Sequence, residues 1–269
     1  MVLITTLVGF YMGSSGSLNL GLLVHCMLGT ALLASGAAAL NQYLEREWDA
    51  RMPRTSDRPI PAGLIQPQMV LLLGASMSVL GLVELVSQVN PLTAVLGAVT
   101  LATYVFVYTP LKRVTTLNTL IGAVPGALPP LMGWTAATGE ISVGGWALFT
   151  ILFFWQLPHF MAISWMYRTD YRDAGFKMLS ADDSDGSRTA AAAIRHTLAL
   201  LAFSLSPVAL HLGGKIYGVG AIVLGLLFLI CAIQFSRSTT RERARQLFFA
   251  SILYLPLILG LLVLDKIKL

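Results

Sequence analysis

Long runs of apolar residues, separated by short polar segments, fill nearly the whole chain. Most of these runs are close to the roughly 20 residues that an α-helix needs to cross the hydrocarbon core of a bilayer. The pattern therefore predicts an all-α, polytopic membrane protein that forms a single domain over residues 1–269. Nine spanning helices are expected, at residues 2–13, 18–44, 68–89, 91–110, 115–134, 143–166, 190–213, 216–236 and 246–264.

The first run, residues 2–13, is shorter than an ordinary spanning helix. It can cross the membrane only if it lies inside a bundle or continues from an upstream start. A signal peptide is the alternative for this run. It is disfavoured because no basic segment precedes the run and no clear cleavage site follows it.

Composition supports the membrane assignment. The chain is 56% hydrophobic and 12% charged, and its mean hydropathy is +0.74. Soluble domains carry charges at roughly 25% of their positions. The lipid bilayer is therefore the expected surroundings of the chain, as a multi-pass protein of the inner or plasma membrane of the cell.

Positive charge is distributed unevenly between the two sets of loops. Of the 18 Lys and Arg residues, 15 fall in or beside the loops after the second, fourth, sixth and eighth runs. The positive-inside rule places these loops in the cytoplasm. The opposite side keeps only Lys215, Lys266 and Lys268. Membrane topology thus accounts for the net charge of +5, and no nucleic-acid motif is present, so nucleic acid is not an expected partner.

A polar stripe interrupts the apolar pattern at the end of the second run. Asn41, Glu45 and Asp49 are spaced four apart, so on an α-helix they share one face. Two carboxylates and a carboxamide this close together favour a hard cation such as Mg²⁺ between them, commonly shared with substrate phosphates. The alternative is a solvated helix end in which Glu45 or Glu47 pairs with Arg51. Ionisable groups near bilayer depth are costly and usually functional, which favours the metal site.

Cationic residues lie on the same predicted side of the membrane as this stripe. Arg54 and Arg58 follow it directly, and Lys112 and Arg113 end the fourth run. Guanidinium and ammonium groups bind phosphate oxygens well. The alternative for Lys112 and Arg113 is an interfacial anchor whose charge reaches the headgroups. Because acidic and basic segments converge on one side, a metal-bound diphosphate is the favoured ligand.

The loop after the sixth run carries a second acidic segment. Asp170 and Asp173 are three apart and can complete the set of oxygen ligands. Pairing with Arg168 and Lys177 on a wet surface is the alternative. Lys177 is also a candidate contact to substrate, and His159, near the end of the sixth run, is a candidate contact to an acceptor.

Four motifs cover the core of the chain from the second predicted helix to the loop after the sixth. They read Asn41-x-x-x-Glu-x-x-x-Asp-x-x-Met-x-Arg-Thr-x-x-Arg-Pro59, Tyr108-Thr-Pro-Leu-Lys-Arg-x-Thr-x-x-Asn118, Ile121-Gly-Ala-x-Pro-Gly-Ala-x-Pro-Pro130-Leu-Met-Gly-Trp134, and Trp155-Gln-x-Pro-His-Phe160 through Asp170-Tyr-x-x-Ala-Gly-x-x-Met-Leu179. With these motifs the chain resembles the UbiA superfamily of intramembrane prenyltransferases. The second, third and fourth motifs point to the heme-modifying branch of that superfamily.

This resemblance implies nine helices around a central cavity that opens to lipid. It implies Mg²⁺-dependent transfer of a farnesyl group from farnesyl diphosphate to a vinyl group of protoheme IX, also called heme B. Heme A synthase or a cytochrome oxidase assembly factor is the candidate protein partner. The metal and diphosphate site then comprises Asn41, Glu45, Asp49 and Asp170, with substrate contacts from Arg54, Arg58, Lys112, Arg113, Asp173, Lys177 and His159.

The chain departs from the family pattern at three places. Glu45 stands where many members have Asp, which keeps the ligand type and lengthens its reach. Ala174 stands at the second Asp of the common Asp-x-x-x-Asp motif, and Asp173 is the candidate substitute. The basic segment usual before the first helix is absent, which a misplaced start codon would explain.

The reaction predicts a mostly apolar pocket, because water must not quench a farnesyl cation before the acceptor attacks it. Two other functions stay open. A prenyltransferase acting on a quinone precursor or a chlorophyll-like ring shares the metal motif. A secondary transporter also places acidic groups at broken helices, but near mid-membrane rather than at helix ends. Candidate walls of the pocket are Tyr43, Trp134, Phe154 and Trp155.

Overall fold

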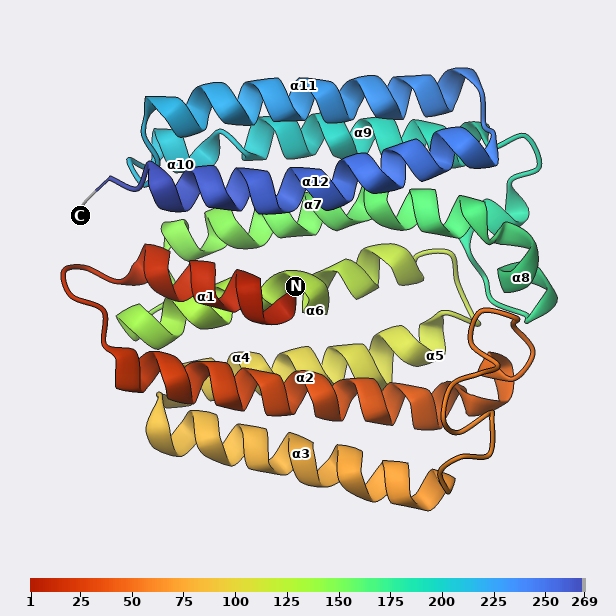
Figure 1. Cartoon of the computed structure of the whole chain (residues 1–269), viewed down its shortest axis with the longest axis horizontal. Helices are drawn as coiled ribbons and strands as arrows, with labels where there is room; N and C mark the ends of the chain where they lie inside the picture. Colours follow the sequence, from red (N-terminus) through yellow and green to blue (C-terminus); the bar gives the residue numbers. More distant parts are fainter. Residues whose placement is uncertain (268–269) are drawn as a thin grey trace.

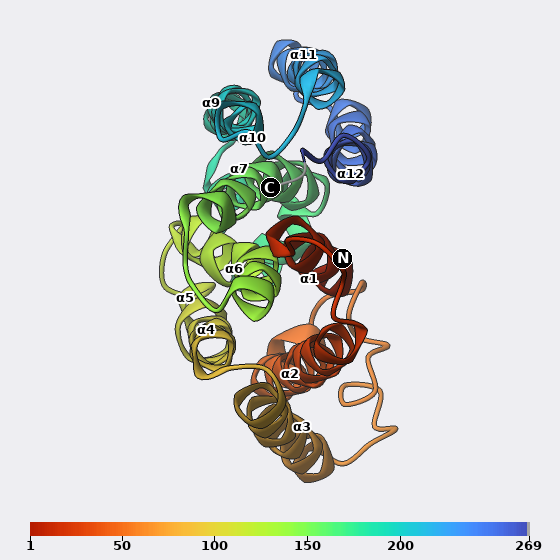
Figure 2. The ribbon, with the colours of Figure 1, turned by 90° about the vertical axis from the view of Figure 1, so that its left-hand side faces the viewer.

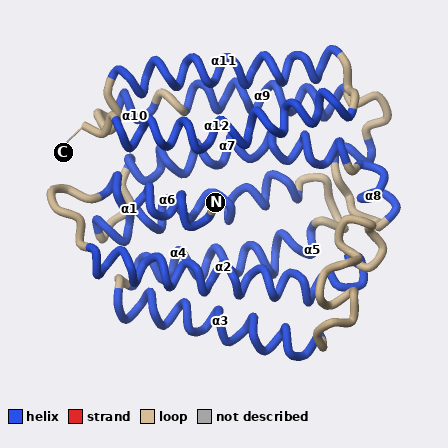
Figure 3. Tube along the Cα trace, viewed as in Figure 1, coloured by secondary structure: helices blue, strands red, loops and turns tan. Residues whose placement is uncertain are grey.

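The structure is an assembly of long helices joined by short loops (Figures 1 and 3). The computed structural model describes residues 1–267. The first helix, α1 (Val2–Gly13), is short and apolar. Eight longer helical stretches within the described residues have the length and hydropathy of membrane spans. They are α2 (Leu20–Asp49), α3 (Pro67–Gln88), Pro91–Leu111, α6 (Asn118–Thr138), α7 (Val143–Met166), Ser187–Ala209, α11 (Lys215–Arg237) and α12 (Arg241–Leu264).

Two of these spans are made of consecutive shorter elements. The span Pro91–Leu111 passes from α-helical to π-helical geometry and back, and the span Ser187–Ala209 is two α-helices separated by a turn at residues 204–205. Two further short elements follow α7 outside the spans. These pieces are α4 (Pro91–Ala102), η1 (Thr103–Tyr108), α5 (Thr109–Leu111), α9 (Ser187–Phe203), α10 (Ser206–Ala209), α8 (Arg168–Asp173) and η2 (Leu179–Asp182).

The all-α membrane architecture expected from the sequence is confirmed. The predicted runs 2–13 and 143–166 coincide with α1 and α7. The main differences are at α2, which continues to Asp49, and at α12, which already begins at Arg241. Both extensions are polar helical turns, which a hydropathy pattern cannot distinguish from loops. Lys268, expected on the side opposite the polar loops, lies outside the described residues.

Side-chain caps and prolines fix where several helices begin. The Oδ1 atom of Asn19 accepts from the amide of Leu22 at 3.1 Å at the start of α2. Asn90 caps α4 in the same way through the amide of Thr93 at 2.8 Å. Caps of this kind satisfy amides that lack a partner within the helix.

The span that contains η1 departs from α-helical geometry just before Pro110. Pro110 has no amide hydrogen, so it removes one hydrogen bond from the helix. The backbone takes π-helical geometry over Thr103–Tyr108, and the carbonyl of Tyr104 accepts from the backbone amide of Thr109 and also from its hydroxyl, the latter at 2.9 Å. Single π-turns of this kind are frequent at functional sites.

The helices lie roughly side by side, with α3 and α11 at opposite edges of the assembly (Figures 1 and 2). Between these edges α6 lies close to α1 and α7. The α1–α6 contact is close enough that a Cβ on Gly133 would meet the backbone of Thr6 and Phe10, the small-residue packing typical of membrane helices. The loops after α2 and α7 meet at one end of the assembly, beside α5 and α8 (right in Figure 1).

Candidate active site

The last turns of α2 line a polar pocket at the end of the assembly where these loops meet. Asn41, Glu45 and Asp49 lie on one face of α2, as their spacing predicted, and they are 7%, 6% and 1% exposed. The pocket encloses about 140 Å³. Its other lining residues come from the loop after α2, from the span that contains η1, and from α8 onward: Met52, Arg54, Thr55, Arg58, Tyr104, Tyr108, Lys112, Tyr171, Phe176 and Met178.

Each carboxylate of the stripe is paired with a cation from another segment. The Nζ atom of Lys112 lies 3.0 Å from both carboxylate oxygens of Glu45 and donates to Oε2. The Nη1 atom of Arg58 donates to Oδ2 of Asp49 at 2.6 Å. The Oε1 atom of Glu45 is buried and has no hydrogen-bond partner within the described part of the chain. The surface pairing of Glu45 or Glu47 with Arg51 is therefore not what the structure shows.

The polar segments are held together by contacts between their backbones and side chains. The amide of Lys177 donates to the carbonyl of Lys112 at 2.7 Å, and Asn118 donates from Nδ2 to the carbonyl of Lys177 at 2.7 Å. Met52 packs against Ala174, Phe176 and Met178 in a small hydrophobic cluster. The loops after α2, α5 and α7 thus form one framework around the pocket.

The charges that line this pocket favour an anionic ligand. Arg54, Arg58 and Lys112 supply three positive charges, whereas Glu45 and Asp49 supply two negative charges. A cleft with a surplus of one sign concentrates ligands of the opposite sign. The forked donors of arginine suit phosphate oxygens in particular.

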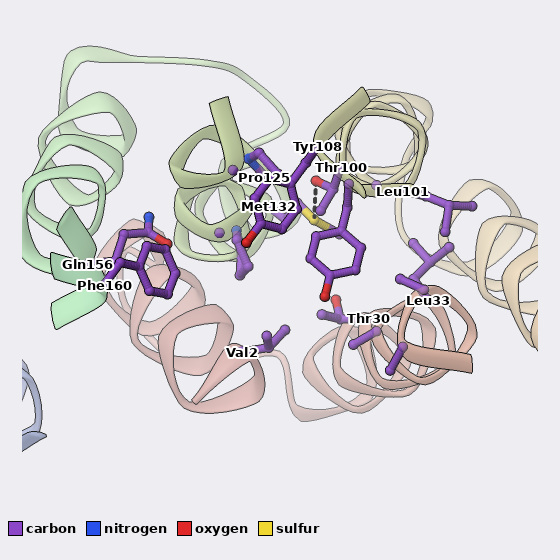
Figure 4. A pocket seen from close by; sticks show the side chains of 18 residues that line it. Val2, Thr30, Leu33, Thr100, Leu101, Tyr108, Pro125, Met132, Gln156 and Phe160 are labelled. Atoms are coloured by element: carbon purple, nitrogen blue, oxygen red, sulfur yellow. Dashed lines mark hydrogen bonds between the residues drawn. The ribbon is translucent and has the colours of Figure 1, made fainter. Parts of the chain in front are cut away.

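An apolar pocket of about 410 Å³ adjoins the polar one and shares Tyr104 and Tyr108 with it. Labelled side chains from α1, α2, α4, η1, α6 and α7 surround it in Figure 4. Small residues leave the space open, and a Cβ on Gly122 would meet the ring of Tyr108. The arrangement suits a molecule with an anionic head and an apolar tail. The small lining residues are Ala34, Ala37, Ala38, Gly97, Gly122 and Gly126.

Several residues predicted for the site lie outside both pockets. The guanidinium of Arg113 stacks on the ring of Trp48, 3.9 Å from its centroid. His159 faces α12, where its Nδ1 atom lies 2.7 Å from the Ser251 hydroxyl. Among the other predicted residues, Asp170 is half-buried on α8, whereas Asp173 and Lys177 are exposed.

The structure brings together three of the four residues predicted to hold a metal ion. Within residues 1–267 no group of three or more His, Cys, Asp or Glu side chains is close enough together to hold a metal ion. Asn41, Glu45 and Asp49 share one pocket, but Asp170 does not line it. The role of Asp170 as a fourth ligand therefore stays a prediction.

The aromatic residues that the sequence predicts as walls of the substrate pocket do not line either pocket, so this prediction is wrong. Tyr43, Trp134, Phe154 and Trp155 line neither pocket, and Trp134 is 5% exposed within the hydrophobic core. The aromatic residues at the junction are instead Tyr104 and Tyr108. In the sequence, these two tyrosines are four residues apart and precede Pro110, which indicates that they share a face of the helix. A hydropathy pattern does not predict the π-helical turn, so it does not show that this face borders the pockets.

Gln156 was also missed as a lining residue. It is 5% exposed on α7, lines the apolar pocket, and donates from Nε2 to the carbonyl of Ala123 at 2.8 Å. A lone amide within an apolar run is costly in a membrane unless it has a partner or a function. That signal was present in the sequence.

A helical membrane bundle in which a cationic pocket adjoins an apolar one is suited to an enzyme that binds isoprenoid diphosphates. The chain belongs to the UbiA prenyltransferase family, whose sequence profile matches residues 2–253. It is therefore a multi-pass membrane prenyltransferase. This membership, together with carboxylates at the end of α2 rather than at its middle, decides against a secondary transporter.

Within the family, the chain is similar to relatives that are named protoheme IX farnesyltransferase. The chain is 44% identical over 275 residues to the protoheme IX farnesyltransferase of Solibacter usitatus, an alignment that covers 99% of this chain and 94% of that protein. It is 49% identical over 251 residues to the protoheme IX farnesyltransferase of Opitutus terrae, with 93% and 84% covered.

Solved structures share the fold at low sequence identity. A digeranylgeranylglyceryl phosphate synthase superposes with a TM-score of 0.84 at 15% identity, covering 100% of this chain and 94% of that one. A UbiA homolog from Archaeoglobus fulgidus bound to DMAPP and Mg²⁺ gives a TM-score of 0.67 at 13% identity, with 97% and 94% covered. At these identities the likeness concerns the fold alone.

Proposed function

We propose that this protein transfers a farnesyl group from farnesyl diphosphate to a vinyl group of protoheme IX, producing heme O and diphosphate. The observation that carries the proposal is the junction at Tyr104 and Tyr108, where a cationic pocket meets an apolar one. The names of the relatives in Solibacter usitatus and Opitutus terrae support heme as the acceptor.

In this proposal the diphosphate lies in the polar pocket. Arg58 and Lys112 donate to its oxygens, and they stabilise the negative charge that grows as the bond to the farnesyl carbon breaks. The farnesyl tail lies in the apolar pocket. Its walls keep water away from the allylic cation until the electron-rich vinyl group attacks. This attack leaves a cation on the vinyl carbon next to the ring. One water molecule adds to that carbon and releases a proton, which completes the hydroxyalkyl group of the product.

The residues present fit a divalent metal ion. Oε1 of Glu45 is buried and accepts no hydrogen bond in the described part of the chain, with the Lys112 ammonium 3.0 Å away as its ion-pair partner. Two carboxylates and a carboxamide line the same pocket. Oxygen donors of this kind suit Mg²⁺. Asn41, Glu45 and Asp49 would hold the ion, with Asp170 from α8 as the fourth candidate. Bound there, Mg²⁺ would supply Lewis-acid stabilisation of the leaving diphosphate.

The proposed setting is the inner or plasma membrane, with the polar pocket on the cytoplasmic side. The positive-inside rule supports this orientation, because Arg and Lys side chains gather at the end of the molecule that carries the pocket. Heme A synthase or a cytochrome oxidase assembly factor is the candidate partner for exchange of heme.

Membranes containing the protein provide the test. They are incubated with labelled farnesyl diphosphate and either heme or 4-hydroxybenzoate, with Mg²⁺ or with EDTA, beside membranes that lack the protein. We expect a product with the mass of heme O only with heme, and its loss in EDTA with recovery on added Mg²⁺. Prenylated 4-hydroxybenzoate would instead identify a sister enzyme, and full activity in EDTA would contradict the metal site.

A further inference from the structure

Two arginines converge on one tyrosine ring beside the polar pocket. The guanidinium carbon of Arg54 lies 5.2 Å from the centroid of the Tyr167 ring, and that of Arg241 lies 5.9 Å from the same centroid. Arg54 follows α2, Tyr167 follows α7, and Arg241 begins α12. Arg54 also donates from Nη2 to the hydroxyl of Tyr171 at 2.9 Å. Three segments far apart in sequence therefore bring two positive charges together.

Neither of these charges is neutralised by the protein within residues 1–267. No Asp or Glu oxygen of the described chain lies within 4.0 Å of Arg54 or Arg241. Arg58 and Lys112, in contrast, each have a carboxylate partner. Membrane topology accounts for arginines at this end of the molecule, but it does not account for two of them on one ring at the rim of a pocket. Both side chains are exposed and open to an incoming ligand.

The same face of α7 connects this arginine pair to the apolar pocket. Gln156 and Phe160 line the pocket and appear together in Figure 4. Tyr167 is seven residues beyond Phe160, which is two helical turns, so it lies on nearly the same face and about 10 Å further along. That separation is close to the width of a porphyrin ring. Protoheme carries its two vinyl groups and its two propionate groups on different edges of that ring.

We propose that Arg54 and Arg241 bind the two propionate carboxylates of the acceptor heme. The porphyrin lies along the last turns of α7, beyond Phe160 and outside the farnesyl pocket, with a vinyl edge directed at the junction of the two pockets and the propionates at the arginine pair. Guanidinium groups bind carboxylates through two parallel hydrogen bonds, which fixes orientation as well as position. This inference rests on the proposed function, because it assigns a site to the acceptor named there.

The test compares two porphyrins on the purified full chain in phosphatidylcholine nanodiscs. Iron protoporphyrin IX has free propionates, and its dimethyl ester does not, and absorbance titration measures the affinity of each. Arg241→Gln is the main variant. Arg245→Gln is its matched control, because Arg245 lies one turn further along α12, contacts Phe249 rather than Tyr167, and has no carboxylate within 4.0 Å in the described chain.

We expect Arg241→Gln to weaken binding of the free porphyrin by about tenfold, as loss of a charge-assisted hydrogen bond does, and to leave the ester unchanged. Arg241→Lys should recover part of the affinity, and Arg245→Gln should bind both porphyrins like the unaltered chain. The KM for farnesyl diphosphate should not change in Arg241→Gln.

Two results would overturn the assignment. One is equal affinity of the unaltered chain for the acid and the ester, as expected if the arginines served lipid phosphate instead. The other is an equal effect of Arg241→Gln and Arg245→Gln. Because the titration needs no turnover, it stays informative if no heme O is formed. A failure of the proposed function is therefore separable from a failure of the propionate site.

Discussion

Asp49 is the most buried ionisable residue of the polar pocket, at 1% exposure. Its carboxylate accepts from Arg58 at 2.6 Å, and its carbonyl accepts from the Thr55 hydroxyl at 2.9 Å. The side chain therefore has one cationic partner and a fixed position. Fixed charges that need not reorganise are the ones that stabilise charge during a reaction most effectively.

We expect Asp49→Asn and Asn41→Ala each to lower heme O formation by about a hundredfold or more, the scale of losing a preorganised electrostatic contact. Asp49→Asn replaces a carboxylate of the proposed Mg²⁺ site by a neutral amide, and Asn41→Ala removes the carboxamide oxygen. Neither change alters the bulk of the side chain enough to unfold α2. The measurement is product formed per amount of protein in membranes.

Asp57→Asn is the matched control for these variants. Asp57 is an exposed carboxylate on the loop that also carries Arg54 and Arg58, and it does not line the pocket. Its removal should leave activity unchanged. Normal activity in Asp49→Asn, with Asp57→Asn as its reference, would show that the metal-site assignment is wrong.

The sequence predicts a side chain of the site where helical spacing alone fixes the face of the helix on which it lies. Asn41, Glu45 and Asp49 repeat every four residues, so any helix brings them to one face. Lys112 and Arg113 are adjacent, so only one can point into the pocket, and packing of Arg113 on Trp48 decides which. A sequence pattern does not contain that partner.

At the scale of elements, α2 has both a pocket face and a lipid face. Its apolar-pocket face is lined by Ala34, Ala37 and Ala38, and its last turns line the polar pocket. Sequence hydropathy predicted the apolar part of this helix and ended it at residue 44. Hydropathy gives no signal for the remainder, because these helical turns bury polar groups, but the four-residue spacing of Asn41, Glu45 and Asp49 predicts that the helix continues.

We expect Ala34→Leu to raise the KM for farnesyl diphosphate by about tenfold, because added methyl groups in a packed site typically cost about 1–3 kcal/mol. The neighbouring change Ser35→Leu is the control, since Ser35 is exposed on the outer face of the helix and lines neither pocket. Steady-state kinetics in membranes with varied farnesyl diphosphate give both values. An equal KM for the two variants would contradict the assignment of the tail to this pocket.

At the scale of the whole molecule, one end carries the polar pocket and most of the charged loops. The loop between α1 and α2 lies at the other end (Figure 1). Both ends have exposed serines, Ser17 in the loop after α1 and Ser56 in the loop after α2. These positions report the orientation of the bundle in the membrane.

In a chain whose own Cys26 and Cys231 are replaced by Ala, we expect Ser56→Cys to react with a membrane-impermeant maleimide only after the cells are permeabilised. Ser17→Cys should react in intact spheroplasts, because the positive-inside rule places it outside. Mass spectrometry of the labelled protein gives the extent of reaction. Reversed labelling would place the polar pocket on the outer side.

The tyrosine pair at the junction of the two pockets has a consequence for how a substrate is oriented. A molecule bound in the reverse orientation would put its phosphate oxygens into the apolar pocket, where unpaired charge is strongly unfavourable. Partitioning alone therefore sorts the two ends of an amphiphile, before any specific contact forms. In the proposed function, the bond between head and tail therefore lies beside Tyr104 and Tyr108, whatever the length of the tail. The physical preference that orients lipids in the surrounding bilayer would then also set the place of the reaction.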